Sequence, residues 1–110
     1  MDLELERGDI VVCALSGDFG KSRLAVVVQS NLFNSTHPSV TLCPITTHIV
    51  EAPLFRLMLI PSAKNGLKQS SQIMVDKITT LLREKIRQKI GDLNPKQISE
   101  LNEALTLWLT

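Results

Sequence analysis

The sequence is poor in cysteine and histidine, and it has no clear excess of charge of either sign. Its two cysteines, Cys13 and Cys43, lie far apart and outside any C-x-x-C motif, which excludes a disulfide framework and a cysteine metal knuckle. We expect both to be buried thiols. The two histidines, His37 and His48, lack the spacing of zinc ligands, and no cluster of Asp and Glu provides an oxygen cage for magnesium. The sequence therefore predicts no metal and no cofactor.

Long apolar runs and a basic surplus are also missing. The longest apolar runs fall far short of the roughly 20 residues that cross a bilayer, and the first residues are acidic and polar. Twelve Lys and Arg against eleven Asp and Glu leave a net charge of +1, unlike that of proteins that grip long stretches of nucleic acid. We therefore expect a cytoplasmic protein without membrane contact, in which any binding of nucleic acid is local.

The apolar residues that are present suffice for one globular domain. The chain has 110 residues, 44% of them hydrophobic, and contains neither a repeat nor a linker. This predicts a single domain over residues 1–110. Because a chain this short exposes a large share of its surface, we expect a partner subunit to cover part of its apolar surface, which predicts a homodimer.

Short runs rich in β-branched and apolar residues predict strands, and turn residues separate them. Pro44 cannot donate to a ladder, so it predicts an edge or a bulge in the third run. Five runs are predicted as strands, at 9–15, 24–28, 40–46, 54–60 and 72–78.

The end of the sequence predicts one amphipathic helix. Asn94 is a preferred N-cap, Pro95 suits the first helical position, and Gln97 completes a capping box. A mainly β fold with α is therefore predicted, as a small, strongly bent antiparallel sheet or partly closed barrel covered by the helix. Four residues at helical spacing form the stripe that we expect to pack on the sheet, namely Ile98, Leu101, Leu105 and Trp108.

Many weak motifs follow one another in a characteristic order along nearly the whole chain. Together they resemble the MazF/PemK family of messenger-RNA interferases. In chain order, the motifs are R-G-D-I at 7–10, the V-V-V-Q strand that follows Arg23, N-L-F-N at 31–34, P-I-T at 44–46, G-L-K at 66–68, V-D-K-I at 75–78, K-I-G-x-L at 89–93 and A-L-x-x-x-L at 104–109.

The resemblance implies a fold and an activity. The fold would be an SH3-like antiparallel barrel of five to seven strands with a C-terminal helix. The activity would be that of a homodimeric toxin of a type II toxin–antitoxin system, an endoribonuclease that cuts single-stranded messenger RNA at a short sequence without a metal and is silenced by a cognate antitoxin. Such cleavage proceeds by attack of the neighbouring 2′-hydroxyl, which needs a proton acceptor, a proton donor and positive groups at the phosphate.

Two catalytic residues follow from the same resemblance. Arg23 aligns with the family's catalytic arginine, and a guanidinium grips a phosphate at two points while stabilising developing negative charge. Thr46 aligns with the family's essential Thr or Ser, whose hydroxyl donates to a phosphate oxygen or orients the attacking group. Without the family match, Thr46 would be interpreted as an ordinary β-branched strand residue.

The proton acceptor is left open between a perturbed Arg23 itself and two further residues. Asp76 falls where some family members are thought to place a base or an RNA contact, and a crowded carboxylate there would have its pKa raised for that work; the alternative is that it pins a turn. His48 would share the face of Thr46 if the strand continued, and histidine suits proton transfer far better than arginine. The alternative for His48 is an exposed loop histidine.

Four residues are candidates for binding RNA. Lys21 lies two residues before Arg23 and would face the same way, and Phe19 in the same loop could stack on a base or anchor the loop. Asn31 could read a base edge or cap a turn, and Thr47 follows the catalytic threonine on the other face.

The sequence also departs from the family pattern. Leu24 stands where proline usually follows the arginine, and Met74 and Thr79 occupy positions where many relatives carry arginine. These changes thin the positive charge, so one alternative is a catalytically inactive relative that only binds RNA. Another is a gyrase poison resembling CcdB, which shares this barrel and acts through a C-terminal tryptophan. Trp108 instead continues the helical stripe, which favours core packing, and its solvent exposure distinguishes the two.

Overall fold

The computed structural model describes residues 3–14 and 21–110, which form seven strands, two α-helices and two single 3-10 turns. The helices are α1 (Asn31–Asn34) and α2 (Pro95–Leu109), and the 3-10 turns are η1 (Val75–Lys77) and η2 (Arg83–Lys85). The strands are β1 (Asp9–Ala14), β2 (Ser22–Val27), β3 (Ser39–Thr46), β4 (Arg56–Leu59), β5 (Ser71–Met74), β6 (Thr79–Leu82) and β7 (Ile86–Asp92).

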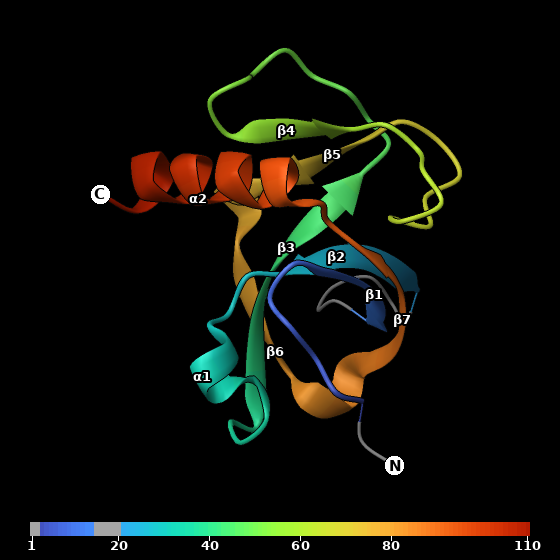
Figure 1. Ribbon diagram of the computed structural model, residues 1–110, viewed down its shortest axis with the longest axis vertical. Helices are drawn as coiled ribbons and strands as arrows, with labels where there is room; N and C mark the ends of the chain where they lie inside the picture. Colours follow the sequence, from blue (N-terminus) through green and yellow to red (C-terminus); the bar gives the residue numbers. More distant parts are fainter. Residues whose placement is uncertain (1–2, 15–20) are drawn as a thin grey trace.

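All strand pairs are antiparallel, in the order β4-β5-β3-β2-β1-β7, with β6 also paired to β3. Strand β3 joins the two halves of the molecule, because residues 39–42 pair with β6 and residues 45–46 pair with β5 (Figure 1). Within the part of the chain that the structure describes, the end strands β4 and β7 do not pair, so the bent sheet is not closed. The predicted mainly β fold with a C-terminal helix is confirmed.

The change of partner along β3 corrects two details of the predicted strands. Pro44 lies in a central strand, not at an edge, and is tolerated because it falls between the segment paired with β6 and the segment paired with β5. The single strand predicted at 72–78 is wrong. Strand β5 ends at Met74, the turn η1 follows, and the next strand, β6, begins only at Thr79, so that the chain leaves one end of β3 and pairs again with the other.

Side chains of the central strands alternate between two apolar cores, one on each face of the sheet. Val26 and Cys43 contribute to a first core that also contains Leu101 of α2. Their neighbours Val27 and Leu42 belong to a second core, built by β1, β2, β3, β6 and β7 where these strands curl around it (Figure 1). Burial on both faces explains why these strands have nearly continuous apolar runs in the sequence.

Both cysteines are buried, as expected. Burial raises the pKa of the Cys43 thiol to about 12. Since the thiolate is the reactive form of cysteine, Cys43 is chemically inert and acts as a small core residue.

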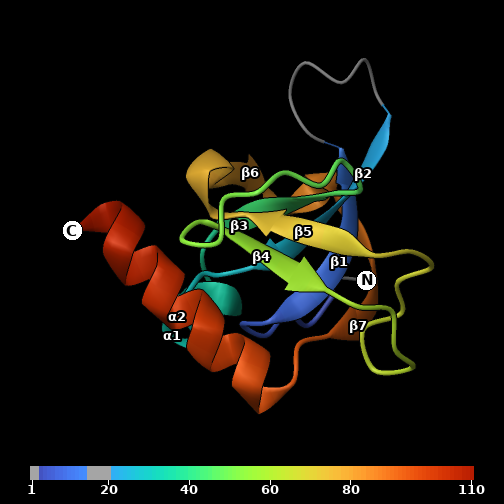
Figure 2. The ribbon, with the colours of Figure 1, turned by 90° about the horizontal axis from the view of Figure 1, so that it is seen from above.

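Helix α2 begins as the sequence predicts. The Asn94 side chain accepts a hydrogen bond from the Gln97 N–H at 2.8 Å, and the Gln97 side chain accepts one from the Asn94 N–H at 2.9 Å. The apolar stripe is only partly buried, however. Leu101 is fully buried, whereas Trp108 is 47% exposed and stacks on Phe55 with ring centroids 5.5 Å apart. The predicted core packing of Trp108 is therefore wrong, because the last turn of the helix extends beyond the sheet (Figure 2). Of the helices in residues 3–14 and 21–110, none has the length and apolar character needed to span a membrane.

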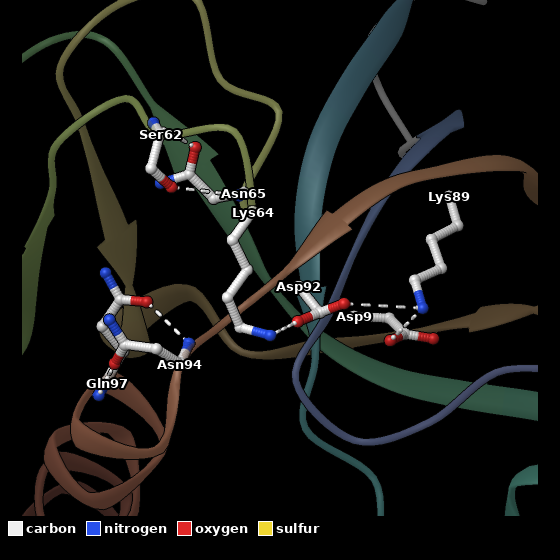
Figure 3. A network of polar contacts seen from close by, with 8 residues as sticks. All are labelled: Asp9, Ser62, Lys64, Asn65, Lys89, Asp92, Asn94 and Gln97. Carbon is white, nitrogen blue, oxygen red and sulfur yellow. Dashed lines mark hydrogen bonds and ion pairs between the residues drawn. The ribbon is translucent and has the colours of Figure 1, made fainter.

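A polar network joins β1, β7 and the loop before β5 beside the start of α2 (Figure 3). The Lys89 ammonium lies 3.1 Å from the Asp9 carboxylate, and the Lys64 ammonium lies 2.5 Å from that of Asp92. The bond to Asp9 raises the pKa of Lys89, and the bond from Lys64 lowers the pKa of Asp92. Asp9 is only 2% exposed, so Lys89 neutralises a buried carboxylate between the first and last strands.

Candidate active site

Arg23 and Thr46 lie at the same end of two neighbouring strands. Strands β2 and β3 last pair at Ala25 and Pro44. Arg23 precedes Ala25 by two residues and Thr46 follows Pro44 by two, so both lie just beyond this last pair, at the same end of the two strands. The start of β2 and the end of β3 lie on the same side of the molecule (Figure 2). Arg23 is exposed and Thr46 half-buried, an arrangement that suits a phosphate bound at the surface.

The strand ends at Thr46 and turns sharply. The Thr46 hydroxyl oxygen accepts a hydrogen bond from the His48 backbone N–H at 3.0 Å, which caps the turn that follows β3. His48 is therefore held next to Thr46 by this turn, and the continued strand on which its placement was predicted is wrong. Thr47 and His48 are both exposed, so their side chains are accessible to a ligand beside Thr46.

A residue that the sequence did not point to lies on the other side of Thr46. Gln72 of β5 is the register partner of Thr46, and it is 3% exposed. Its side-chain oxygen accepts from the Val50 N–H at 3.1 Å, and its amide nitrogen donates to the Val50 carbonyl at 2.8 Å. A single glutamine in a strand carries no signal of this contact in the sequence, because the partner is the backbone of a distant loop residue.

Asp76 lies in η1, and its contacts differ from those of a catalytic base. Both carboxylate oxygens bind the Arg56 guanidinium, with Oδ1 2.7 Å from Nε and Oδ2 3.1 Å from Nη2. The hydrogen bond from Arg56 lowers the pKa of Asp76, which corrects the raised pKa predicted for this residue. Along β5 the chain moves away from Thr46 before it reaches Asp76, because Thr46 pairs with Gln72 at the beginning of that strand.

The structure separates the candidate RNA contacts. Lys21 is exposed and lies directly before β2, at the same end as Arg23. Phe19 lies outside the described residues. Asn31 begins α1, at the opposite end of β2 from Arg23. Its side-chain oxygen accepts from the Arg7 N–H at 2.7 Å and from the Asn34 amide at 2.8 Å, whereas the cap of α1 is Ser30, whose hydroxyl accepts from the Leu32 N–H.

Within residues 3–14 and 21–110, no three side chains of His, Cys, Asp or Glu gather in the way that metal ligands do. The end of the sheet that carries Arg23 and Thr46 presents a guanidinium, a hydroxyl and the imidazole of His48.

Comparison with known proteins places the chain in a family. The profile of the family described as PemK-like, MazF-like toxin of type II toxin–antitoxin systems matches residues 6–109. A protein of Mycolicibacterium smegmatis named as a probable endoribonuclease MazF is 35% identical over 106 residues, covering 96% of each chain. Endoribonuclease EndoA of Bacillus subtilis is 27% identical, over 96% of this chain and 94% of its own.

Solved structures share the same fold. A MazF toxin of Mycobacterium tuberculosis superposes with a TM-score of 0.80 at 25% identity, over 92% of this chain and 95% of its own. An endoribonuclease of mycobacterial origin, solved in complex with its cognate antitoxin, also gives a TM-score of 0.80, at 23% identity and over 96% of this chain and 94% of its own. At 23% identity, the similarity to this second structure shows a shared fold alone.

Proposed function

The chain belongs to the PemK-like, MazF-like toxins of type II toxin–antitoxin systems, and we propose that it is an endoribonuclease whose single domain cleaves single-stranded messenger RNA without a metal. The observation that carries the site is the shared position of Arg23 and Thr46 at one end of β2 and β3. Family membership supports this activity over that of a gyrase poison.

The proposed reaction is attack of the 2′-oxygen on the neighbouring phosphorus. A 2′,3′-cyclic phosphate forms, the bond from phosphorus to the 5′-oxygen breaks, and the leaving strand ends in a 5′-hydroxyl. Arg23 binds two phosphate oxygens and stabilises the charge that builds on them. Thr46 supports it by donating its hydroxyl proton, which is available because the oxygen already accepts the His48 N–H. Solvent at this exposed end of the sheet supplies the proton for the 5′-oxygen.

His48 is the proposed acceptor of the 2′-hydroxyl proton. It is exposed beside Thr46, whereas Asp76 is engaged by Arg56 through both of its oxygens. A carboxylate whose pKa is lowered in this way is a weaker base than an ordinary one. The contacts of the two side chains therefore favour His48 over Asp76 as the base.

Replacing His48 with glutamine is expected to lower kcat by about 10²-fold and to remove the acidic limb of its pH profile, because proton transfer by a side chain contributes about that much. The measurement is the initial rate of cleavage of a fluorescent oligoribonucleotide across a range of pH. The matched control is His37→Gln, since His37 is also exposed but precedes β3 at its other end. An unchanged profile in His48→Gln excludes His48 as the base.

Incubation of the purified protein with mixed single-stranded RNA in excess EDTA tests the function itself. We expect cleavage to persist, and the products to carry 2′,3′-cyclic phosphate and 5′-hydroxyl ends, because Arg23 takes the place of a metal at the phosphate. Intact RNA, with or without added magnesium, would overturn the assignment as an endoribonuclease. Cleavage only with magnesium would overturn the proposed mechanism and leave the activity standing.

The proposed partners follow from the relatives. A MazF-like endoribonuclease with this fold has been solved with its cognate antitoxin, and we propose that an antitoxin protein likewise silences this chain in the cytoplasm. A homodimer is proposed because large apolar side chains remain exposed on the described surface, among them Leu32, Leu54 and Leu107. Sedimentation equilibrium of the protein without its antitoxin measures this state.

A further inference from the structure

Both polar atoms of the Gln72 side chain form hydrogen bonds with the backbone of one residue, Val50. Its oxygen and nitrogen bind the N–H and the carbonyl of Val50 at 3.1 and 2.8 Å, as a neighbouring strand would. The residue is 3% exposed, so these bonds are shielded from water and are costly to lose. The pairing joins β5 to a loop residue that lies beyond the end of β3.

The loop held in this way begins at Thr46. The chain leaves β3 at Thr46 and reaches Val50 four residues later. Thr46 stands at the start of this segment, and its partner in the neighbouring strand β5 is Gln72, which binds the end of the segment at Val50. Opposite residues of an antiparallel pair direct their side chains to the same face. The Thr46 hydroxyl and the Gln72 carboxamide therefore hold the two ends of one turn, the first through the His48 N–H and the second through Val50.

The turn determines how the Thr46 hydroxyl is oriented. A hydroxyl that accepts one fixed N–H has its own proton directed to another acceptor, whereas a free hydroxyl rotates. If Val50 were released, the His48 N–H would move with the turn, and the hydroxyl of Thr46 would lose its constraint. Displacements of about 1 Å in a catalytic group can lower a rate by about 10²-fold.

We propose that Gln72 is a positioning residue for RNA cleavage, which holds residues 47–50 so that the Thr46 hydroxyl is directed at the scissile phosphate. The inference rests on the proposed endoribonuclease function. Gln72 itself touches no reacting atom, since both polar ends of its side chain are engaged by Val50.

A double-mutant cycle between Gln72→Met and Thr46→Val tests this role. We expect Gln72→Met to lower kcat by about tenfold or more in the wild-type background, with KM changed by less than about twofold. In the Thr46→Val background the same change should lower kcat by less than about threefold, because the group that Gln72 orients is already gone. Gln88→Met, at an exposed position of β7, is the matched control and should leave both constants unchanged.

A second variant and a second measurement keep the test decisive if Gln72→Met folds poorly. Gln72→Glu preserves the shape and the acceptor for the Val50 N–H, but its ionised form cannot donate to the Val50 carbonyl. It should lower kcat in the same background-dependent way. In Gln72→Met, which removes the acceptor, hydrogen exchange at the Val50 amide should accelerate, as measured by NMR on the RNA-free protein.

The outcomes separate this inference from the function on which it rests. If the wild type cuts no RNA, the proposed function fails and the inference fails with it. If the wild type cuts and Gln72→Met loses kcat by equal factors in the two backgrounds, the function stands and the positioning role is overturned. An unchanged kcat in both variants, or unchanged protection of the Val50 amide in Gln72→Met, overturns it as well.

Discussion

Replacing Arg23 with alanine is expected to lower kcat for RNA cleavage by about 10³-fold, the loss typical of removing a donor that stabilises developing charge. Arg23 is exposed near the beginning of β2, at the same end of the sheet as Thr46 of β3. With no cationic group at that position, the negative charge on the attacked phosphate would be stabilised only by the Thr46 hydroxyl and solvent. The rate is measured under single-turnover conditions in EDTA, so that RNA binding and the chemical step are separated.

Two comparisons show whether the loss is specific. Arg23→Lys keeps the charge but loses the planar fork that binds two oxygens, so its kcat should lie between those of the wild type and Arg23→Ala. Arg87→Ala removes an exposed arginine from β7 and should leave kcat unchanged. Thermal unfolding should be nearly the same for all three variants, because surface changes usually alter stability little. Full cleavage by Arg23→Ala would show that the reaction takes place elsewhere.

Replacing Asp76 with alanine is expected to destabilise the fold by about 2 kcal/mol, the loss typical of removing a charged hydrogen-bond partner from a partly buried pair. The side chains of Arg56 and Asp76 are only 12% and 18% exposed, and they meet through two hydrogen bonds. Without the carboxylate, the Arg56 guanidinium is left poorly solvated beneath η1. The free energy of unfolding is measured by urea denaturation at neutral pH.

The same pair predicts how stability depends on pH. Arg56 holds the pKa of Asp76 below its ordinary value, so Asp76 binds a proton more weakly in the folded than in the unfolded chain. Its contribution is therefore fully present above the unfolded pKa of about 3.9, and it is lost as the pH falls through the folded value. We expect the urea midpoint of the wild type to fall more steeply below pH 4 than that of Asp76→Asn, which cannot titrate.

Activity of the Asp76 variants separates a structural role from a catalytic one. The double variant Arg56→Met with Asp76→Leu removes both charges, and it should recover much of the stability lost in Asp76→Ala. If Asp76 is structural, the kcat of this folded double variant stays within about threefold of the wild type, since no reacting group has been removed. A loss of kcat by about 10²-fold at recovered stability would instead indicate a base.

Much of the molecule could be predicted from patterns that are local in the sequence. The start of α2 is of this kind, because Asn94 and Gln97 satisfy each other's backbone groups within one turn. Most of the strands could similarly be located from apolar runs, because a strand that is buried on both faces has apolar residues at successive positions. The order of the family motifs then indicated the toxin family and drew attention to Arg23 and Thr46.

Predictions from the sequence failed where a residue contacts a partner that is distant along the chain. The stripe on α2 does not reveal where the sheet ends, so Trp108 was expected in the core and is instead half-exposed against Phe55. Similarly, the pattern of 72–78 does not reveal that β3 has two successive partners along one side, so one strand was expected where β5 ends and the turn η1 leads to β6.

The fold class, the capped helix and the family follow from the sequence alone, because each depends on residue type, spacing or motif order, and the two residues proposed for the centre of the site come from the same motifs. How that proposed site is assembled is visible only in the folded chain. Strand register brings Arg23 and Thr46 to one end of the sheet, and bonds between distant residues engage Asp76 with Arg56 and Gln72 with Val50. Such contacts depend on how strands pair in space, and a single sequence carries no record of that pairing.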